Sequence, residues 1–518
     1  MRSDPTTYDV LVIGAGPAGV TAATVLARHG VNVLVIERHE GTSPLPKATS
    51  VTTRTMELLR TWGLEQRVRA GAIRARPVLS VSHTLVDSHQ VDAPFGYPTD
   101  EAALAVSPTT PCYCSQDHLE PVLLEHLRSS GGQVRFSTEL IGFTADATGV
   151  DATLRDCAPG NATGHAERIR ARYLIGADGP RSTVRTGAGI DLEDLGSVGE
   201  YVAVTFRTDL TRRLPRLPAV LNLVEIAGAE GLFMPTSTDD KWIYGRERHP
   251  ERGEALEDWT PQRCTELIRA GTGLPELRPE ILAIMPFVMS GQVAAALRAG
   301  RIFLVGDAAH QTTPVGGAGM NIAIHGAHNL GWKLSWVLRG WAGAALLDSY
   351  EAERRPIGTQ NVLRTLRRKI EFEGDELAWD IGTHYTSAVI VPWPGPEPGP
   401  GQRAPHAWVR HGGSRVSTLD LFDGRLTVLT GARGEPWRRA VAELAADGLP
   451  IVALSDEREL RDEDGAFAQH YRLGAEGAAL VRPDGYLAWR HSGAEPDPRA
   501  ALRSAVELAL GWADAPAT

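Results

Sequence analysis

Two glycine-bearing turns, each directly after a short apolar run, constrain this chain more than any other feature of its sequence. Gly14–Gly19 follows the run Val10–Ile13, and Gly306–His310 follows Ile302–Val305 almost three hundred residues later. An apolar run, a glycine turn and a helix in that order are typical of a strand–turn–helix unit that binds a dinucleotide. A third turn, Gly176–Gly179, lies between the two. The sequence therefore predicts one nucleotide-binding domain that is assembled from distant segments.

Length and composition predict several domains with a large core. The chain has 518 residues, of which 42% are hydrophobic, and this length corresponds to two or three domains. A formal charge of −10, without runs of Lys or Arg, argues against a nucleic-acid partner. Four cysteines are too few for a disulfide framework and suit a reducing cytoplasm. Cys112 and Cys114 have no second pair nearby to complete a zinc site, so we expect strand packing and no metal.

Residues 10–27 carry no charge and are of borderline length for a membrane span. Glycines and a proline interrupt this run at the places where a strand–turn–helix needs them, and no basic segment precedes it. We therefore interpret the run as a strand and a helix, and we expect a cytoplasmic protein with no membrane partner.

Periodicity and breaker residues predict the following elements. In the first 390 residues we expect strands at 8–13, 31–37, 133–136 and 301–305, and helices at 17–29, 51–61, 117–130, 317–339 and 345–369. Residues 80–112, 138–175 and 198–290 are rich in predicted strands, with one helix near 261–269. Residues 392–401 have the composition of a linker. Beyond it we expect strands at 426–429, 451–454 and 479–481 and helices at 435–446 and 499–511.

The first turn has the spacing of a pyrophosphate-binding loop. Its glycines allow the backbone to approach a pyrophosphate, and the helix that follows supplies free N–H groups and a favourable dipole. Glu37 ends the next strand, 23 residues after Gly14. A carboxylate there accepts hydrogen bonds from ribose hydroxyls and repels a 2′-phosphate. The bound nucleotide is therefore predicted to be FAD or NAD.

The second turn repeats this logic with an aspartate. We expect the strand before Asp307 to lie beside the first strand, with Asp307 exposed to bind ribityl or ribose hydroxyls. Aspartate is also a common helix N-cap, which is the alternative. The segment Pro314–Asn321 opens a long helix with several glycines. Its N–H groups and dipole would stabilise negative charge on the pyrimidine end of a flavin.

Together these motifs resemble the class A flavoprotein monooxygenases, the family of p-hydroxybenzoate hydroxylase. Within that family the chain is similar to the aromatic polyketide hydroxylases that have a thioredoxin-like C-terminal domain. The resemblance covers residues 8 to about 358 and also the tail. The matching segments are Gly14–Gly19, Glu37-Arg38, Pro46–Ala48, Arg54–Leu59, Gln116, Leu119-Glu120, Gly176–Gly179, Arg181-Ser182, Gly306–His310, Pro314–Asn321, Asn329–Leu334, Tyr350–Pro356, Gly401–His406 and Ser417–Phe422.

The resemblance implies an α/β fold in three parts. A Rossmann-type FAD-binding domain, similar to that of glutathione reductase, would comprise residues 1–80, 112–190 and 291–390. A β-rich substrate domain would be inserted at 81–111 and 191–290. Residues 403–518 would form a thioredoxin-like α/β domain, which here lacks cysteine and so cannot carry out dithiol chemistry.

The resemblance also implies which residues bind FAD. They are Gly14, Gly16, Pro17, Ala18, Gly19, Glu37, Arg38, Lys47, Gln116, Asp178, Asp307, Pro314, Gly317, Gly319, Met320 and Asn321. Lys47 stands where the family usually has arginine, which keeps the charge but loses the fork geometry. Gly326 stands where the family often has aspartate. His310 is interpreted as structural, and His325 and His328 as packed or partly exposed.

The implied reaction is the hydroxylation of a polycyclic aromatic phenol of polyketide type, as in EC 1.14.13. NAD(P)H would bind transiently and reduce FAD, and O2 would give a flavin C4a-hydroperoxide. The backbone of Pro314 and Gly319 is expected near the reacting flavin, Arg54 and the strands at 198–290 are candidate pocket walls, and no residue is identified as a base. Baeyer–Villiger or oxidative-rearrangement chemistry, or a non-catalytic flavin-binding protein, stay open as alternatives. We expect a monomer or a homodimer.

Overall fold

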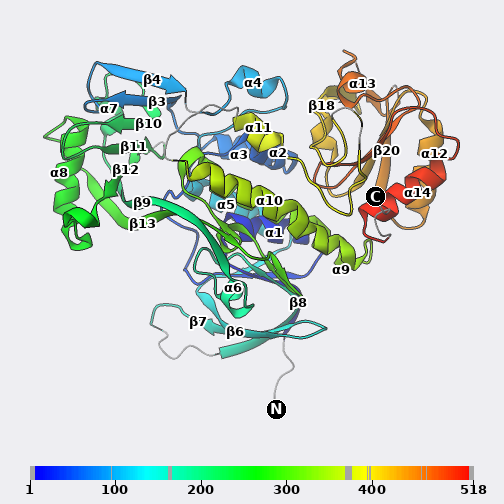
Figure 1. Ribbon diagram of the computed structural model, residues 1–518, viewed down its shortest axis with the longest axis horizontal. Helices are drawn as coiled ribbons and strands as arrows, with labels where there is room; N and C mark the ends of the chain where they lie inside the picture. The colour runs from blue at the N-terminus through cyan, green and yellow to red at the C-terminus, as the bar shows by residue number, and fades with distance from the viewer. Residues whose placement is uncertain are drawn as a thin grey trace.

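The computed structural model describes residues 6–94, 96–160, 166–237, 239–367, 376–393, 395, 398–456, 458–462 and 464–512. Three parts follow one another across the molecule (Figure 1). A β-rich part with the helix α8 lies at one end, a large α/β part with the long helices α9 and α10 lies in the middle, and an α/β part made by the C-terminal residues lies at the other end. The three-part α/β fold expected from the resemblance is thus confirmed.

The middle part is built on a largely parallel sheet in the order β14-β15-β8-β1-β2-β5. Its strands, together with the hairpin strands β6 and β7 that extend from β8, are β1 (Thr6–Ile13), β2 (Val33–Ile36), β5 (Gln133–Arg135), β6 (Thr138–Ala145), β7 (Val150–Asp156), β8 (Ala166–Gly176), β14 (Arg298–Ala299) and β15 (Ile302–Leu304). The second half of β1, Val10–Ile13, and the whole of β2 consist of Val, Leu and Ile and are buried, as expected when helices cover both faces of a sheet.

Helices surround this sheet and carry much of the site. They are α1 (Pro17–Arg28), α2 (Thr53–Thr61), α3 (Glu65–Arg69), α4 (Asp100–Leu104), α5 (Gln116–Ser129), α6 (Thr183–Gly187), α9 (Ala318–Leu338), α10 (Asp348–Thr365) and α11 (Glu376–Ile381). The helix α1 packs against both α5 and α9, and ten of its twelve residues are buried. The last residues of the helix predicted at 345–369 lie outside the described residues.

One expectation about this sheet is wrong. The strand before Asp307, β15, pairs in parallel with β8 and not with β1. The strand β8 takes the place beside β1 because its eleven residues are long enough to pair with β1 on one side and with β7 and β15 on the other. The turns after β1 and β15 still lie at the same edge of the sheet, with the turn after β8 between them.

A second, eight-stranded sheet forms the predicted substrate domain, in the order β16-β13-β9-β12-β11-β10-β3-β4. Its strands are β3 (Arg76–Ser82), β4 (Gln90–Pro94), β9 (Leu192–Arg207), β10 (Ala219–Val224), β11 (Gly231–Pro235), β12 (Lys241–Arg248), β13 (Glu280–Ala294) and β16 (His310–Gln311). It is accompanied by α7 (Leu210–Arg213) and α8 (Pro261–Thr272). The boundaries predicted at residues 80 and 290 fall within β3 and β13, so this sheet extends slightly beyond them on both sides.

The C-terminal part contains a four-stranded sheet in the order β20-β19-β22-β23. The pair β19/β20 is parallel and the pairs β19/β22 and β22/β23 are antiparallel, which is the arrangement expected of a thioredoxin-like domain. Its strands are β17 (Trp408–His411), β18 (Ser414–Ser417), β19 (Leu426–Thr430), β20 (Ile451–Ser455), β21 (Leu460–Arg461), β22 (Ala478–Val481) and β23 (Leu487–His491), and its helices are α12 (Glu435–Ala446), α13 (Ala466–Tyr471) and α14 (Pro498–Ala509). Of the predicted linker at 392–401, residues 394, 396 and 397 lie outside the described residues.

The hydrophobic core continues from the middle part into the C-terminal part. One buried cluster joins strand residues of the middle sheet to Trp437, Leu480 and Val506 of the C-terminal domain. The substrate sheet and α8 enclose a separate cluster around Phe206, Phe233 and Trp242. Within the described part of the chain, no helix combines the length and the apolar character that a membrane crossing requires.

Candidate functional site

The first glycine turn packs directly against the turn after β8. The Gly14 N–H donates to the Ile36 carbonyl at 2.8 Å, which fixes the turn where β1 and β2 lie side by side. Gly14 has a φ of +104°, and a Cβ atom on it would lie 2.3 Å from the carbonyl oxygen of Ala177. Only glycine fits so close an approach. The turns after β1 and β8 therefore meet at the carboxyl ends of their parallel strands, where ligands bind in open α/β sheets.

The turn after β15 closes onto the same place. Gly306 has a φ of +64°, and a Cβ on it would lie 2.9 Å from the Cβ of Ala18 in the first turn of α1. Arg185 of α6 donates to the carbonyls of Pro180 at 3.1 Å and Ala308 at 3.4 Å, which links the turn after β8 to the turn after β15. Three distant segments of the chain thus form one continuous surface.

Glu37, directly after β2, directs its carboxylate at the first glycine turn. Its Oε2 accepts a hydrogen bond from the Ala15 N–H at 2.9 Å, and its Oε1 accepts one from the His39 N–H at 3.0 Å. The side chain is 14% exposed, and each carboxylate oxygen has more than one acceptor site. Oε1 also contacts the His39 ring nitrogen at 2.5 Å, so Glu37 stabilises the turn and keeps acceptor capacity for a hydroxyl group at Oε2. The neighbouring Arg38 is exposed.

Gln116, the first residue of α5, is buried and engages a carboxylate one helical turn further on. Its Nε2 donates to Oε1 of Glu120 at 2.6 Å, and Oε2 of Glu120 accepts the Ser43 N–H at 2.9 Å. Burial raises the pKa of Glu120 above its ordinary value, and the hydrogen bonds from Gln116 and Ser43 oppose that rise. The Gln116–Glu120 pair thus anchors the loop that carries Lys47.

The charges of Lys47 and Asp307 interact at the surface formed by the three turns. Both side chains are in contact with solvent. Partial removal of water by the surrounding protein raises the pKa of the Asp307 carboxylate, and the Lys47 ammonium opposes that rise. The same ammonium also opposes the rise in the pKa of Glu120. The positive charge of Lys47 therefore interacts with two carboxylates of this region.

Asp178 uses its carboxylate within its own segment. One oxygen accepts from the Ser182 hydroxyl, and the other accepts from the Val184 N–H at 3.1 Å. These bonds order the start of α6. The backbone of Asp178 lies against the first glycine turn, since a Cβ on Gly14 would approach its Cα to 3.2 Å. The contact of Asp178 with the pyrophosphate stays a prediction.

The start of α9 is a pair of left-handed glycines after Pro314. Gly316 and Gly317 have φ values of +74° and +60°, which a residue with a side chain rarely adopts. The buried Asn321 fixes the first turn of the helix: its Oδ1 accepts from the Thr52 N–H, and its Nδ2 donates to the Ser50 and Gly317 carbonyls, all at 3.0 Å. The Asn321 side chain is thus used within the protein, and the contacts of the Gly319, Met320 and Asn321 backbone with a ligand stay predictions.

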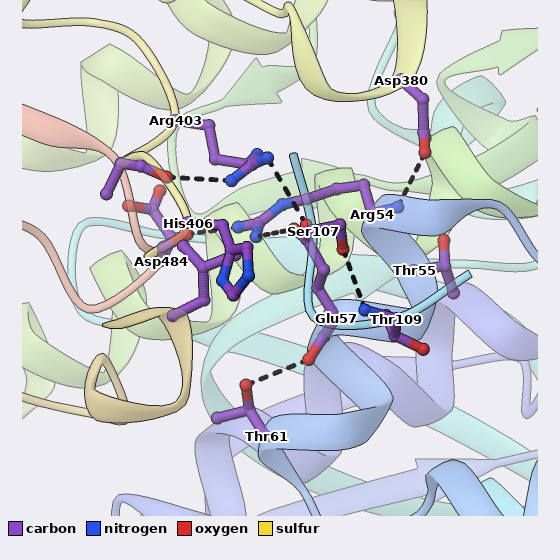
Figure 2. A network of polar contacts seen from close by, with 12 residues as sticks. Arg54, Thr55, Glu57, Thr61, Ser107, Thr109, Asp380, Arg403, His406 and Asp484 are labelled. Atoms are coloured by element: carbon purple, nitrogen blue, oxygen red, sulfur yellow. Dashed lines mark hydrogen bonds and ion pairs between the residues drawn. The ribbon is translucent and has the colours of Figure 1, made fainter. Parts of the chain in front are cut away.

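Arg54 binds groups of its own helix and of the C-terminal domain. Its guanidinium donates to Oε2 of Glu57 at 2.9 Å and to the backbone carbonyl of Asp484 in the C-terminal domain at 2.6 Å (Figure 2). Arg403 approaches the other oxygen of Glu57 at 3.5 Å, and the Asp380 carboxylate accepts the Arg54 N–H at 2.7 Å. The role of Arg54 as a pocket wall stays a prediction, and its partner in the C-terminal domain is one that the sequence pattern does not reveal.

A buried charge cluster was not foreseen from the sequence. Glu353 of α10 accepts from Lys333 of α9 at 2.7 Å and from both terminal nitrogens of Arg482 at 2.7 and 2.9 Å, and all three side chains are 0% exposed. Asp484 pairs with Arg482 on the other side. The family-like segments Asn329–Leu334 and Tyr350–Pro356 contain Lys333 and Glu353 and were the available signal, but Arg482 and Asp484, which complete the cluster, lie in the C-terminal domain.

The aromatic residues of the substrate sheet divide into two groups. Phe233, Trp242 and Tyr244 are fully buried beneath α8 and belong to the core of that domain. Tyr201 and Phe287 form a partly buried pair on the neighbouring strands β9 and β13, with ring centroids 5.9 Å apart. The buried group forms the core of the domain, so residues that line a pocket must come from less buried positions.

The histidines and cysteines have packing roles. Burial lowers the pKa of His310 to about 4, so its ring stays neutral at pH 7. The His325 ring nitrogen lies 2.9 Å from the Thr55 hydroxyl, and burial lowers the pKa of His328 to about 3. Cys112 and Cys114 are buried, free and paired through their backbones with neighbouring segments, as expected for strand packing.

The described residues suit FAD. Backbone turns that leave no room for a Cβ, a carboxylate at the end of β2 and a glycine-rich helix start match the pyrophosphate, ribose and flavin ends of such a ligand. Residues 7–365 match the family model described as FAD binding domain. Residues 397–513 match the model described as aromatic-ring hydroxylase, C-terminal.

The chain belongs to the FAD-dependent aromatic-ring hydroxylases, which confirms the family and the enzyme class that the motifs indicate. It is 38% identical to tetracenomycin A2 monooxygenase-dioxygenase of Streptomyces glaucescens, over 97% of this chain and 96% of that protein. It is 37% identical to aklavinone 12-hydroxylase of Streptomyces purpurascens, over 97% and 98% of the two chains. A crystal structure of aklavinone-11 hydroxylase with FAD and aklavinone matches it with a TM-score of 0.89 at 35% identity, covering 98% and 100% of the chains.

Proposed function

We propose that this FAD-dependent monooxygenase hydroxylates a phenolic ring of a polycyclic aromatic polyketide, with NAD(P)H as the electron donor and O2 as the oxidant. The end-to-end similarity to a hydroxylase that was crystallised with FAD and aklavinone carries the proposal. The three converging turns and the separate β-rich domain support it, because the first suit the cofactor and the second suits a large planar substrate. Bound FAD would supply the chemistry that passes electrons from NAD(P)H to oxygen.

The residues of the site would have the following roles. Glu37 and the turn at Gly14–Gly19 would bind the adenosine and pyrophosphate groups, and Asp307 would accept hydrogen bonds from the ribityl hydroxyls. Lys47 would balance the charge of the pyrophosphate. The N-terminus of α9 would place its N–H groups and positive dipole end at the flavin pyrimidine, where negative charge develops. The substrate domain would exclude water from the reacting ring.

Several finer points belong to the same proposal. NAD(P)H would bind only briefly, since no second glycine fingerprint follows a strand in the sequence. Arg38 would bind the adenosine side of FAD, Gln116 would contact the flavin and its ribityl chain, and Asp178 would lie near the pyrophosphate. We also propose that the protein works in the cytoplasm, as a monomer or a homodimer.

The test is turnover with product identification. The purified holoenzyme, with its FAD spectrum recorded, is mixed with NADH or NADPH and tetracyclic or anthraquinone phenols, and the O-methylated compounds serve as matched controls. We expect phenol-dependent NAD(P)H oxidation and a product heavier by one oxygen with its rings retained. A ring-expanded lactone would establish Baeyer–Villiger chemistry instead. Formation of hydrogen peroxide alone with every phenol would contradict the proposed substrate class, and absence of any NAD(P)H oxidation would indicate a non-catalytic flavoprotein.

A further inference from the structure

We propose that Asp484 of the C-terminal domain is a positioning residue for the flavin end of the site, through the hydrogen bonds that it accepts from α9. The turn between β22 and β23, residues 482–486, is here called the Asp484 turn. The inference rests on the proposed placement of the flavin at the N-terminus of α9. It gives the cysteine-free thioredoxin-like domain a role in the reaction that needs no thiol.

The carboxylate of Asp484 contacts α9 directly. Its Oδ2 accepts a hydrogen bond from Nδ2 of Asn329 at 3.2 Å and one from Nε1 of Trp332 at 3.1 Å. The Asp484 side chain is 2% exposed, and the Arg482 guanidinium keeps its pKa below the ordinary value despite the cost of burial. A buried charged acceptor with two donors on one helix fixes that helix both along its axis and in rotation.

A second connection runs from the Asp484 turn through α2 to the start of α9. The Asp484 carbonyl accepts from Arg54 of α2 (Figure 2). The residues around the start of α2 in turn bind α9, through the Thr52 N–H to Asn321 and the Thr55 hydroxyl to His325. The contacts of Asn321 and His325 lie within the first two turns of α9.

A third connection uses the aromatic residue of the same turn. Tyr486 stacks on Tyr385 with ring centroids 4.1 Å apart. The Tyr385 hydroxyl accepts from Arg354 at 3.1 Å, and Arg354 also donates to the Ile322 carbonyl of α9 at 3.1 Å. Three routes thus lead from one turn of the C-terminal domain to the helix whose N-terminus faces the flavin in the proposed site, and the Arg54 guanidinium, 5.6 Å from the centroid of the Tyr486 ring, connects the second with the third.

This arrangement has a measurable consequence. The dipole of a correctly placed α9 would favour the reduced, anionic flavin, and its effect falls off within the first turn of the helix. Loosening α9 would therefore make the bound flavin harder to reduce, even where FAD stays bound. A contact that only held the two domains together would leave the reduction equilibrium unchanged.

The test compares two substitutions at interdomain carboxylates in the holoenzyme. Asp484→Asn removes the negative charge of the carboxylate that accepts hydrogen bonds from α9. Asp420→Asn removes a carboxylate that binds Arg60 at the far end of α2, at 2.9 and 3.1 Å, without touching α9. Each protein is equilibrated with a reference dye of known potential, and the ratio of reduced to oxidised flavin is measured from the spectrum.

We expect Asp484→Asn to lower this ratio about tenfold, equivalent to about 30 mV for two electrons, and Asp420→Asn to leave it unchanged. Equal ratios in all three proteins, or equal losses in both variants, would overturn the inference. If Asp484→Asn does not retain FAD, Trp332→Phe decides, since it removes one donor to Asp484 and should lower the ratio in the same direction. The measurement needs bound FAD but no substrate, so a wrong substrate class would not affect it.

Discussion

The carboxylate of Glu37 has two tasks, because it accepts backbone N–H groups of the glycine turn and of His39 and lies where a ribose is expected. Glu37→Gln keeps the size of the side chain but replaces one acceptor oxygen by an NH2 group that faces a donor. Losing a hydrogen bond to a charged group costs about 1.5 to 3 kcal/mol, so the dissociation constant for FAD should rise at least about tenfold. Fluorescence titration of the apoprotein with FAD measures it.

Glu40→Gln is the matched control for this substitution. Glu40 is exposed three residues further along the same loop, and its neutralisation changes the net charge equally. It should leave the affinity for FAD within about twofold. Equal losses in both variants would mean that general charge, and not the position of Glu37, determines binding.

Residue identities were the most predictable part of the site, and side-chain partners the least. The position of Glu37 follows from its distance to the glycine turn, since both belong to one β-α-β unit. The partner of Gln116 lies one helical turn away and could have been considered from the i,i+4 spacing. Arg54 also has a local partner, Glu57 at i,i+3, but its partner Asp484 lies 430 residues away, and no local pattern contains that contact.

At the scale of elements, the left-handed start of α9 depends on Gly317. A Cβ on this residue would lie 2.7 Å from the Tyr97 hydroxyl and 3.4 Å from the Ser50 Cβ, in addition to its φ of +60°. Gly317→Ala should therefore shift the first turn of α9, and we expect a loss of FAD affinity of about tenfold or more together with an altered flavin absorption spectrum. Titration of the apoprotein and the visible spectrum of the holoenzyme are the measurements.

The other end of the same helix offers the control. Gly340 has a φ of +74°, but a Cβ on it would meet no atom within 4 Å. Gly340→Ala should cost about 1 kcal/mol of unfolding free energy for its backbone conformation and leave FAD binding unchanged. Identical FAD affinity in both variants would show that the start of α9 is not part of the binding site.

The sequence predicted these elements better than their arrangement. Helices such as α1 and α9 have long, capped or glycine-bounded patterns, and the observed bounds differ from the predicted ones by few residues. The neighbour of β15 was wrong because every buried parallel strand has the same apolar composition, so composition carries no information about strand order. The substrate-sheet boundaries shifted because β3 begins before residue 80 and β13 continues past residue 290.

At the scale of the whole molecule, the middle and C-terminal domains should unfold as one unit. A single hydrophobic cluster spans both, and the fully buried Arg482 of the C-terminal domain pairs with Glu353 of α10. Arg482→Met would leave the Glu353 and Asp484 carboxylates with less positive charge in a buried setting. Breaking a buried pair in this way costs about 3 to 5 kcal/mol, so calorimetry should show one transition that is shifted to lower temperature as a whole.

Arg439→Met is the control for the loss of an arginine from the C-terminal domain. Its side chain is 78% exposed, and its ion pair with Glu435 is loose, so the substitution should change the unfolding free energy by less than about 0.5 kcal/mol. Two separate transitions, of which Arg482→Met moves only one, would contradict the single unit. A single shifted transition would instead mean that the C-terminal domain, through its buried charges, stabilises the helices that carry the flavin end of the site.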